Sequence, residues 1–148
     1  MKKLTETYPG YKLRFTGHSL GGALATLAVV EADAVLKLRN FEVITFGSPR
    51  VGDKNFALYF NSKFMDTSFR VVHDRDLVAH IPIQTQGFNH VGTEVWETQD
   101  LKLYLCPSDG SDENSFCANG ILGFDWKIED HFVYLLLPIV KSDNELTA

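Results

Sequence analysis

The chain has 148 residues, of which 45% are hydrophobic and 22% charged, a composition typical of one globular domain and unlike a disordered or fibrous chain. Its formal net charge of −5 gives no basic footprint for nucleic acid, and no apolar run approaches the ~20 residues that span a bilayer. The polar residues 1–7 do not resemble a secretory signal. We therefore expect one domain over residues 1–148, without a nucleic-acid partner, a transmembrane segment or a signal peptide.

The first half of the chain alternates between segments typical of helices and of strands. Helices are expected at residues 1–7, 20–38 and 53–64, and strands at 12–16, 41–46 and 69–72. The segment 41–46 is apolar enough to be buried on both faces, as parallel strands usually are. Long helices between such strands indicate a parallel sheet flanked by helices.

The pattern changes after residue 92. Segments 94–98 and 101–105, separated by Gln99-Asp100, are typical of a hairpin. The remainder is predicted to be mostly loop until the apolar segment 132–137. The expected fold class is therefore α/β, with a mostly parallel sheet and a late hairpin.

The two cysteines, Cys106 and Cys117, leave one possible intramolecular pair. The polar segment between them contains Asp109-Gly110, a turn signal that would let its ends approach each other. A disulfide closing about ten residues would contribute on the order of 3 kcal/mol and would imply an oxidising compartment. Two free buried thiols are the alternative.

A Gly-x-Ser-x-Gly motif lies in Gly17-His18-Ser19-Leu20-Gly21, between the first predicted strand and the long helix. A nucleophilic serine needs such a sharp strand-to-helix turn, and we expect Gly17 and Gly21 to remove side chains that would collide there. The backbone N–H of Leu20 would face an oxyanion at the start of the helix. The alternative is a glycine-rich turn with an incidental serine.

A serine nucleophile needs a base and an orienting acid, and in this architecture they follow in the order serine, acid, histidine. Asp76 comes just after the third predicted strand, at the sheet edge to which Ser19 also returns. Asp74 is the rival acid on the sequence alone.

Five histidines could supply the base. His18 lies in the turn itself, where packing beside the nucleophile is expected, and His73 precedes Asp76. His80, His90 and His131 follow the acid, and spacing does not choose firmly among them. We select His131, and we expect His73 and His90 to be structural.

Four motifs in order resemble the class 3 (fungal-type) lipase family of α/β-hydrolases over about residues 1–137. They are Gly17-His18-Ser19-Leu20-Gly21-Gly22-Ala23-Leu24-Ala25, Thr45-Phe46-Gly47-Ser48-Pro49-Arg50-Val51-Gly52-Asp53, Arg75-Asp76-Leu77-Val78, and Asp130-His131 with Tyr134. The resemblance implies a serine esterase that acts on acylglycerols at a lipid–water interface.

The resemblance also implies roles for particular residues. Ser19 would be the nucleophile, Asp76 the acid in preference to Asp74, and His131 the base. Secreted members have a disulfide between the hairpin and the histidine, which favours the pair Cys106 and Cys117 and a secreted full-length protein. Phospholipids and feruloyl esters stay open as substrate classes.

One departure from the family pattern is large. Members have a long segment before the serine, which includes the lid and the second oxyanion donor, whereas only 18 residues precede Ser19 here. The resemblance thus implies the C-terminal half of the fold, without N-terminal strands and lid. The strand 12–16 would then expose an unpaired edge, to be covered by the missing half or by an oligomer. The alternative function is an impaired remnant that binds a partner through this edge.

Metal and phosphate signals are weak. The acidic run Asp109-Gly110-Ser111-Asp112-Glu113 resembles a calcium loop only in composition, and no P-loop or dinucleotide glycine pattern occurs. We expect no metal and no cofactor.

Overall fold

A computed structural model describes residues 2–37, 41–106 and 113–139 of the chain. The helix end expected at Leu38 and the turn expected at Asp109-Gly110 lie outside these residues, as does most of the acidic run. No helix in the described part of the chain is long and apolar enough to cross a membrane.

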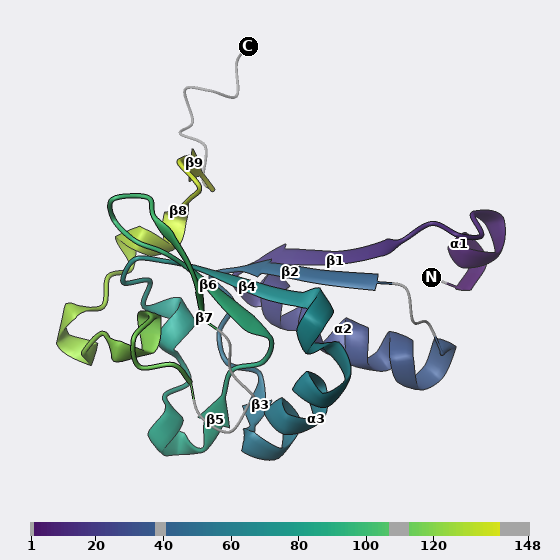
Figure 1. The fold of residues 1–148 in the computed structure, drawn as a ribbon, viewed down its shortest axis with the longest axis horizontal. Helices are drawn as coiled ribbons and strands as arrows, with labels where there is room; N and C mark the ends of the chain where they lie inside the picture. Colours follow the sequence, from purple (N-terminus) through teal and green to yellow (C-terminus); the bar gives the residue numbers. More distant parts are fainter. Residues whose placement is uncertain (1, 38–40, 107–112, 140–148) are drawn as a thin grey trace, which may run out of the picture.

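The main sheet has five strands in the order β1-β2-β4-β6-β7, with β1 at one edge (Figure 1). Neighbours among the first four are parallel, and β6 and β7 form the antiparallel pair expected as a hairpin. The strands are β1 Leu13–His18, β2 Phe41–Phe46, β4 Ser68–His73, β6 Thr93–Glu97 and β7 Leu103–Cys106. The expected mixed sheet of an α/β protein is therefore confirmed.

The strand register brings three connecting loops to one edge of the sheet. His18 at the end of β1 pairs with Phe46 at the end of β2, and Phe46 in turn pairs with Val71 in β4. The carboxyl ends of parallel strands form the site edge in open α/β sheets. The turns that follow β1, β2 and β4 consequently lie side by side.

Two longer helices, α2 Leu20–Leu36 and α3 Lys54–Phe64, lie on the same side of the sheet in Figure 1, and α1 spans Lys2–Thr7. Helix α3 begins where expected, because the Asp53 carboxylate accepts a hydrogen bond from the Phe56 N–H at 2.8 Å. The main core cluster consists of Val29, Phe41, Val43, Ala57, Phe60, Phe64 and Val91.

The large apolar side chains of α2 mostly face away from this core. Leu20, Leu24, Leu27 and Val35 are all exposed. The buried face consists mainly of small residues, which let the helix lie close to β1 and β2: Gly22, Ala23, Ala25, Thr26, Val29, Ala32 and Asp33.

The remaining elements are short. Strands β3 (Gly52–Asp53) and β5 (Phe88–Asn89) pair with each other, and β8 (Val133–Tyr134) pairs with β9 (Leu137–Pro138). Single 3₁₀ turns occur at Met65–Thr67, Val78–His80, Gln84–Gln86, Ala118–Gly120, Gly123–Asp125 and Glu129–Phe132. Residues 113–139 thus contain only short elements, of which β8 contacts β4 of the main sheet.

A disulfide joins Cys106 at the end of β7 to Cys117, 11 residues later. The predicted pairing is confirmed, and the alternative of two free thiols is wrong. The bond fixes the start of the segment that leads to His131.

Candidate active site

Ser19 stands at the turn between β1 and α2 in a strained backbone conformation, with φ 56° and ψ −131°. A non-glycine residue at positive φ costs about 1–3 kcal/mol and tends to occur at functional sites. The Ser19 N–H donates to the carbonyl oxygen of Phe46 at 2.9 Å, which fastens the turn to the end of β2. Ser19 occupies the N-cap position of α2, yet its side chain makes no capping hydrogen bond.

Two glycines give this turn its clearance, but only one of them was expected. A Cβ on Gly17 would lie 2.3 Å from the backbone of Gly21, and a Cβ on Gly22 would lie 2.8 Å from the Ser48 side chain. A Cβ on Gly21 would meet nothing within 4 Å in the described structure apart from its chain neighbours and the backbone of its own helix. The close approaches found at this turn are therefore at Gly17 and Gly22, and the expected need for Gly21 stays a prediction.

Leu20 is the first residue of α2, and first-turn N–H groups have no acceptor within their own helix. The role of its backbone N–H as an oxyanion donor next to Ser19 stays a prediction. The Leu20 side chain is 67% exposed, so it does not fill the core beneath the turn.

Asp76 and His131 form a buried hydrogen-bonded pair. Nδ1 of His131 lies 2.8 Å from Oδ2 of Asp76, and the two residues are 4% and 0% exposed. The other carboxylate oxygen, Oδ1, accepts a hydrogen bond from the Val78 N–H at 2.7 Å. The Tyr134 hydroxyl donates to Oδ2. Such bonds hold an ionised carboxylate in one orientation.

Backbone contacts bring the two residues together although 55 positions separate them. Asp76 forms an isolated parallel bridge with Lys127. The Lys127 N–H donates to the Arg75 carbonyl at 2.8 Å, and the Leu77 N–H donates to the Lys127 carbonyl at 3.0 Å. The segment before His131 is thereby paired with the loop that carries Asp76.

His18 connects the serine turn to this pair. Its ring centre lies 4.4 Å from that of His131, and its Nε2 lies 2.8 Å from the His131 carbonyl oxygen. Burial lowers the pKa of His18 from its ordinary value of 6.5. His18, the residue next to Ser19, thus packs on His131. This contact brings the serine turn close to His131 at the carboxyl end of the strands.

The turn after β2 passes directly over the same pair. Gly47 has φ 54°, and a Cβ there would lie 2.7 Å from Oδ2 of Asp76, 2.8 Å from the Tyr134 hydroxyl and 2.9 Å from Nδ1 of His131. Sequence reasoning placed Gly47 in a motif without giving it a role. A side chain at Gly47 would collide with the buried Asp76–His131 contact, and the positive φ at this position independently favours glycine.

The rival residues have other partners. The carboxylate of Asp74 accepts from Arg75 at 3.0 Å, and Nδ1 of His73 lies 3.0 Å from the Glu97 carboxylate. Nε2 of His90 lies 2.6 Å from the Ala79 carbonyl oxygen. The ring nitrogens of His80 lie close to the carbonyl oxygens of Asp76 and Ala118. His73 and His90 are thus hydrogen-bonded in place.

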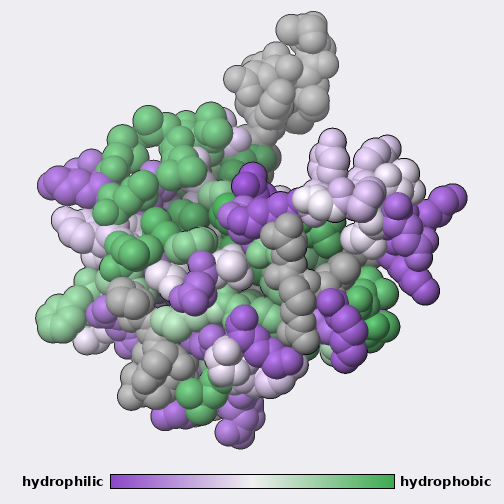
Figure 2. Space-filling model, turned by 45° about the vertical axis from the view of Figure 1, so that its right-hand side comes forward, coloured by the Kyte–Doolittle hydropathy of each residue, from purple (hydrophilic) through white to green (hydrophobic). Residues whose placement is uncertain are grey.

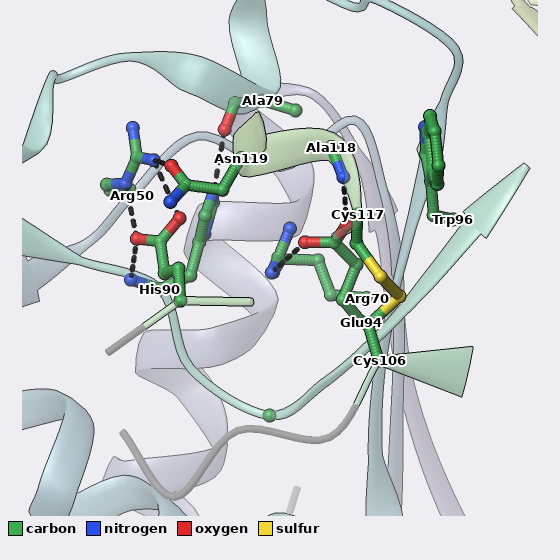
Figure 3. A network of polar contacts seen from close by, with 12 residues as sticks. Arg50, Arg70, Ala79, His90, Glu94, Trp96, Cys106, Cys117, Ala118 and Asn119 are labelled. Atoms are coloured by element: carbon green, nitrogen blue, oxygen red, sulfur yellow. Dashed lines mark hydrogen bonds and ion pairs between the residues drawn. A yellow bond between two sulfur atoms is a disulfide. The ribbon is translucent and has the colours of Figure 1, made fainter. Parts of the chain in front are cut away.

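Sequence reasoning missed a buried ionic network beside the disulfide (Figure 3). The Arg50 guanidinium donates two hydrogen bonds to the Glu113 carboxylate, from Nε at 2.6 Å and from Nη2 at 2.7 Å. Arg70 donates to the Glu94 carboxylate at 2.8 Å. Burial opposes ionisation of Glu113, but the hydrogen bond from Arg50 and the nearby positive charges lower its pKa to about 2. The charge of Arg50 is therefore neutralised inside the protein.

The same region contains one close group of metal-type donor atoms in the described part of the chain. Glu94, Cys106 and Cys117 place their donor atoms within 4.8 Å of one another. Because both sulfurs belong to the disulfide, they are not available as thiolate ligands.

The strained serine turn at the carboxyl edge of a parallel sheet, with a buried acid–histidine pair beside it, defines an α/β-hydrolase site. A family model described as Lipase (class 3) matches residues 1–86. The chain belongs to the class 3 lipase family.

Curated relatives agree with this family. A lipase of Rhizopus niveus is 40% identical over 131 residues, covering 86% of this chain and 32% of the relative. A lipase of Rhizomucor miehei is 40% identical over 132 residues, covering 86% and 35%. The secreted mono- and diacylglycerol lipase 2 of Gibberella zeae is 32% identical over 124 residues, covering 74% and 30%. The chain spans about a third of the length of these relatives.

Solved structures give the same result. A lipase from Rhizopus microsporus var. chinensis superimposes with a TM-score of 0.84 and 37% identity, covering 93% of this chain and 48% of that chain. A triacylglycerol lipase whose catalytic centre is a serine protease triad superimposes with a TM-score of 0.83 and 36% identity, covering 92% and 52%. The fold is thus that of about half of a fungal lipase.

Proposed function

We propose that the protein to which these residues belong is a serine carboxylester hydrolase of the lipase type, with Ser19 as nucleophile, His131 as base and Asp76 as acid. The observation that carries the proposal is the buried Asp76–His131 hydrogen bond of 2.8 Å next to the strained turn at Ser19. The membership of the family supports the same assignment.

In the first half of the reaction, Oγ of Ser19 attacks the ester carbonyl carbon while Nε2 of His131 takes the hydroxyl proton. The Leu20 N–H donates a hydrogen bond to the resulting oxyanion. Asp76 accepts from Nδ1 of His131 and stabilises the imidazolium. The bond between the carbonyl carbon and the alkoxy oxygen then breaks as His131 gives that oxygen the proton, so the alcohol leaves and the acyl group stays on Oγ of Ser19.

In the second half, a water molecule attacks the acyl carbonyl carbon as His131 takes one of its protons. The tetrahedral intermediate collapses, the bond to Oγ of Ser19 breaks, and His131 returns the proton to that oxygen. The carboxylic acid is released and the site is restored.

We further propose acylglycerols at a lipid–water interface as substrates, with phospholipids and feruloyl esters as other classes to be tested. Apolar side chains gather at the upper left of the face shown in Figure 2, with hydrophilic side chains among and beside them. Several large ones on the segment after the disulfide are exposed, among them Phe116 at 91%, Phe124 at 83% and Leu136 at 68%. Exposed apolar surface of this kind is typical of contact with lipid or protein. The related mono- and diacylglycerol lipase supports the same class.

The decisive experiment combines covalent labelling with hydrolysis. The full-length protein is treated with a fluorophosphonate probe, and hydrolysis of a short-chain nitrophenyl ester and of emulsified triacylglycerol is measured in parallel. We expect label on Ser19 and loss of both label and turnover in Ser19→Ala, whereas Ser62→Ala, on the exposed face of α3, keeps both. Hydrolysis that survives Ser19→Ala would contradict the proposal.

A second candidate function is a partner-binding module that is impaired in catalysis. It is favoured by the position of β1 at the edge of the main sheet, where backbone N–H and C=O groups on one side have no strand beside them in the described structure. The preceding half of the fold or a second copy of the chain would cover this edge. A monodisperse monomer of these 148 residues with esterase activity would rule this candidate out.

We also propose that the full-length protein is secreted. The disulfide between Cys106 and Cys117 is typical of an oxidising compartment, and one relative is named as a secreted lipase. Detection of the protein in the culture medium of its source organism, with the disulfide intact by mass spectrometry, tests this proposal.

A further inference from the structure

His80 is a buried histidine that the proposed reaction does not use. It is 2% exposed and ends the 3₁₀ turn Val78–His80, four residues after Asp76. Its Nδ1 lies 2.7 Å from the Asp76 carbonyl oxygen, and its Nε2 lies 2.9 Å from the Ala118 carbonyl oxygen. Both neighbours are acceptors, so a neutral ring donates to one of them at a time and an imidazolium donates to both.

The ring also contacts the segment that leads to His131. It stacks on Trp126 with ring centres 4.6 Å apart and an angle of 26° between the planes. The next residue, Lys127, forms the backbone bridge to Asp76. A single side chain therefore contacts the backbone of the acid, the turn after the disulfide and the approach to the base.

Surrounding groups hold His80 in this position. Arg50 donates through Nη1 to the carbonyl oxygens of His80 and Pro82 and through Nη2 to Oδ1 of Asn119. Figure 3 shows Asn119 and Ala118 on one short turn, with Arg50 on one side and the Arg70–Glu94 contact on the other. The turn at Ala118 is fixed further by its own N–H, which donates to Glu94 at 2.9 Å. The Ala118 carbonyl oxygen, which lies next to Nε2 of His80, is therefore held in place.

We propose that His80 is a positioning residue for the Asp76–His131 pair, joining the Asp76 backbone to the Cys117–Asn119 turn and, through Trp126, to the chain that carries His131. Misplacement of a catalytic group by about 1 Å can cost on the order of 100-fold in rate. His80 does not touch the reacting atoms, so its effect acts entirely through the geometry of Asp76 and His131. The kinetic part of this inference rests on the proposed function, whereas the structural part does not.

The test compares three variants of the full-length protein. His80→Phe keeps a ring for Trp126 but has no donor, and His80→Gln keeps one donor nitrogen. His90→Phe is the matched control, since it removes another buried histidine-to-carbonyl bond of the same loop without touching Asp76.

We expect His80→Phe to lower kcat by about 10- to 100-fold with KM changed by less than about twofold, and His80→Gln to recover part of the loss. His90→Phe should keep kcat within about threefold of the wild type. An equal loss of kcat in His80→Phe and His90→Phe, or a change in KM alone, would overturn the inference. If neither His80 variant folds while His90→Phe does, His80 serves folding as a whole and the inference is likewise overturned.

A second measurement separates this inference from the proposed function. The proton on Nδ1 of His131, hydrogen-bonded to Asp76, should give a downfield proton resonance in the wild type and in His90→Phe, and this resonance should broaden or shift in His80→Phe. An unchanged resonance in His80→Phe, or none in the wild type, would overturn the positioning role. The resonance does not depend on ester hydrolysis, so absence of activity would count against the proposed function and the kinetic part of the inference, and the structural part would still be tested.

Discussion

Tyr134 donates a hydrogen bond to the same carboxylate oxygen of Asp76, Oδ2, that lies 2.8 Å from Nδ1 of His131. Burial and then the negative charge of Asp76 raise the pKa of Tyr134 well above its ordinary value of 10.0, so the phenol keeps its proton and stays a donor. Two donors of different kinds thus converge on one oxygen of the acid.

Replacement of Tyr134 by phenylalanine removes one of these donors without changing the ring. We expect the free energy of unfolding to fall by about 1.5 to 3 kcal/mol, the usual value of a hydrogen bond to a charged group. The decrease in kcat should be much smaller than for Asp76→Asn, for which a loss on the order of 10⁴ is expected. Urea unfolding and ester hydrolysis measure the two effects. Tyr104→Phe, at an exposed position, is the control, and equal stability losses in the two variants would contradict the prediction.

Gly47→Ala should disable the site more strongly than its backbone strain alone explains. A residue with a Cβ at positive φ costs about 1 to 2 kcal/mol, and at Gly47 the added carbon would also lie under 3.0 Å from atoms of Asp76, Tyr134 and His131. Gly87→Ala is the matched control, because Gly87 has φ 89° and open space around its Cβ position. We expect labelling of Ser19 to be lost only in Gly47→Ala. Equal labelling in both variants would show that the close approach at Gly47 is unimportant.

Acid should destabilise the fold in two stages. Burial lowers the pKa of His90 well below 6.5. As the pH falls below 6.5, His90 is protonated in the unfolded chain but not in the folded protein, so the free energy of unfolding decreases. The pKa of Glu113 is lowered from 4.5 to about 2, so its contribution of about 3 kcal/mol is fully present above pH 4.5 and is lost as the pH falls towards 2.

Urea unfolding followed by tryptophan fluorescence over this pH range measures both stages. Glu113→Gln should remove the stage below pH 4.5 and lower stability at neutral pH by about 3 to 5 kcal/mol, because Arg50 is left buried without its counter-charge. Asp100→Asn, which removes a carboxylate from an exposed and solvent-screened ion pair, should change the acid profile much less than Glu113→Gln does. A profile unchanged in Glu113→Gln would disprove the role of the buried pair.

Reduction of the disulfide should loosen the segment that carries His131. Opening a link of 11 residues should lower the free energy of unfolding by about 2 to 4 kcal/mol. We expect fluorophosphonate labelling to become slower as well, because Cys117 begins the chain that leads to the base. The variant with both Cys106→Ser and Cys117→Ser should behave like the reduced protein and should not respond to reductant. Equal labelling rates before and after reduction would contradict the prediction.

The sequence predicted those helices and strands whose hydropathy pattern or capping residue lies within the segment itself. The buried strand β2 has the expected bounds, and Asp53 caps α3 as expected. The two-residue strands β3 and β5 were not predicted, since a pair of residues has no periodicity to read.

The surroundings of the site depend on contacts between distant residues, which spacing does not encode. Arg50 and Glu113 are 63 positions apart, and no pattern in either segment points to the other. His80 similarly has the same sequence signal as His90 or His131, and only the fold shows which carbonyls and which aromatic ring it contacts. The resemblance to a family selected His131, whereas the polar groups that hold it became visible only in three dimensions.

The last described segment, residues 113–139, has no helix or strand longer than four residues. It is attached to the rest of the protein by a disulfide, an ion pair, side-chain hydrogen bonds and a short backbone bridge at Lys127. Such a segment can open as a cooperative unit at a lower free energy than the whole protein. Hydrogen exchange should then show its amides exchanging before those of β2 and β4. This local opening equilibrium would then set the fraction of molecules able to react. Heat or mild denaturant would abolish ester hydrolysis while the main sheet is still folded.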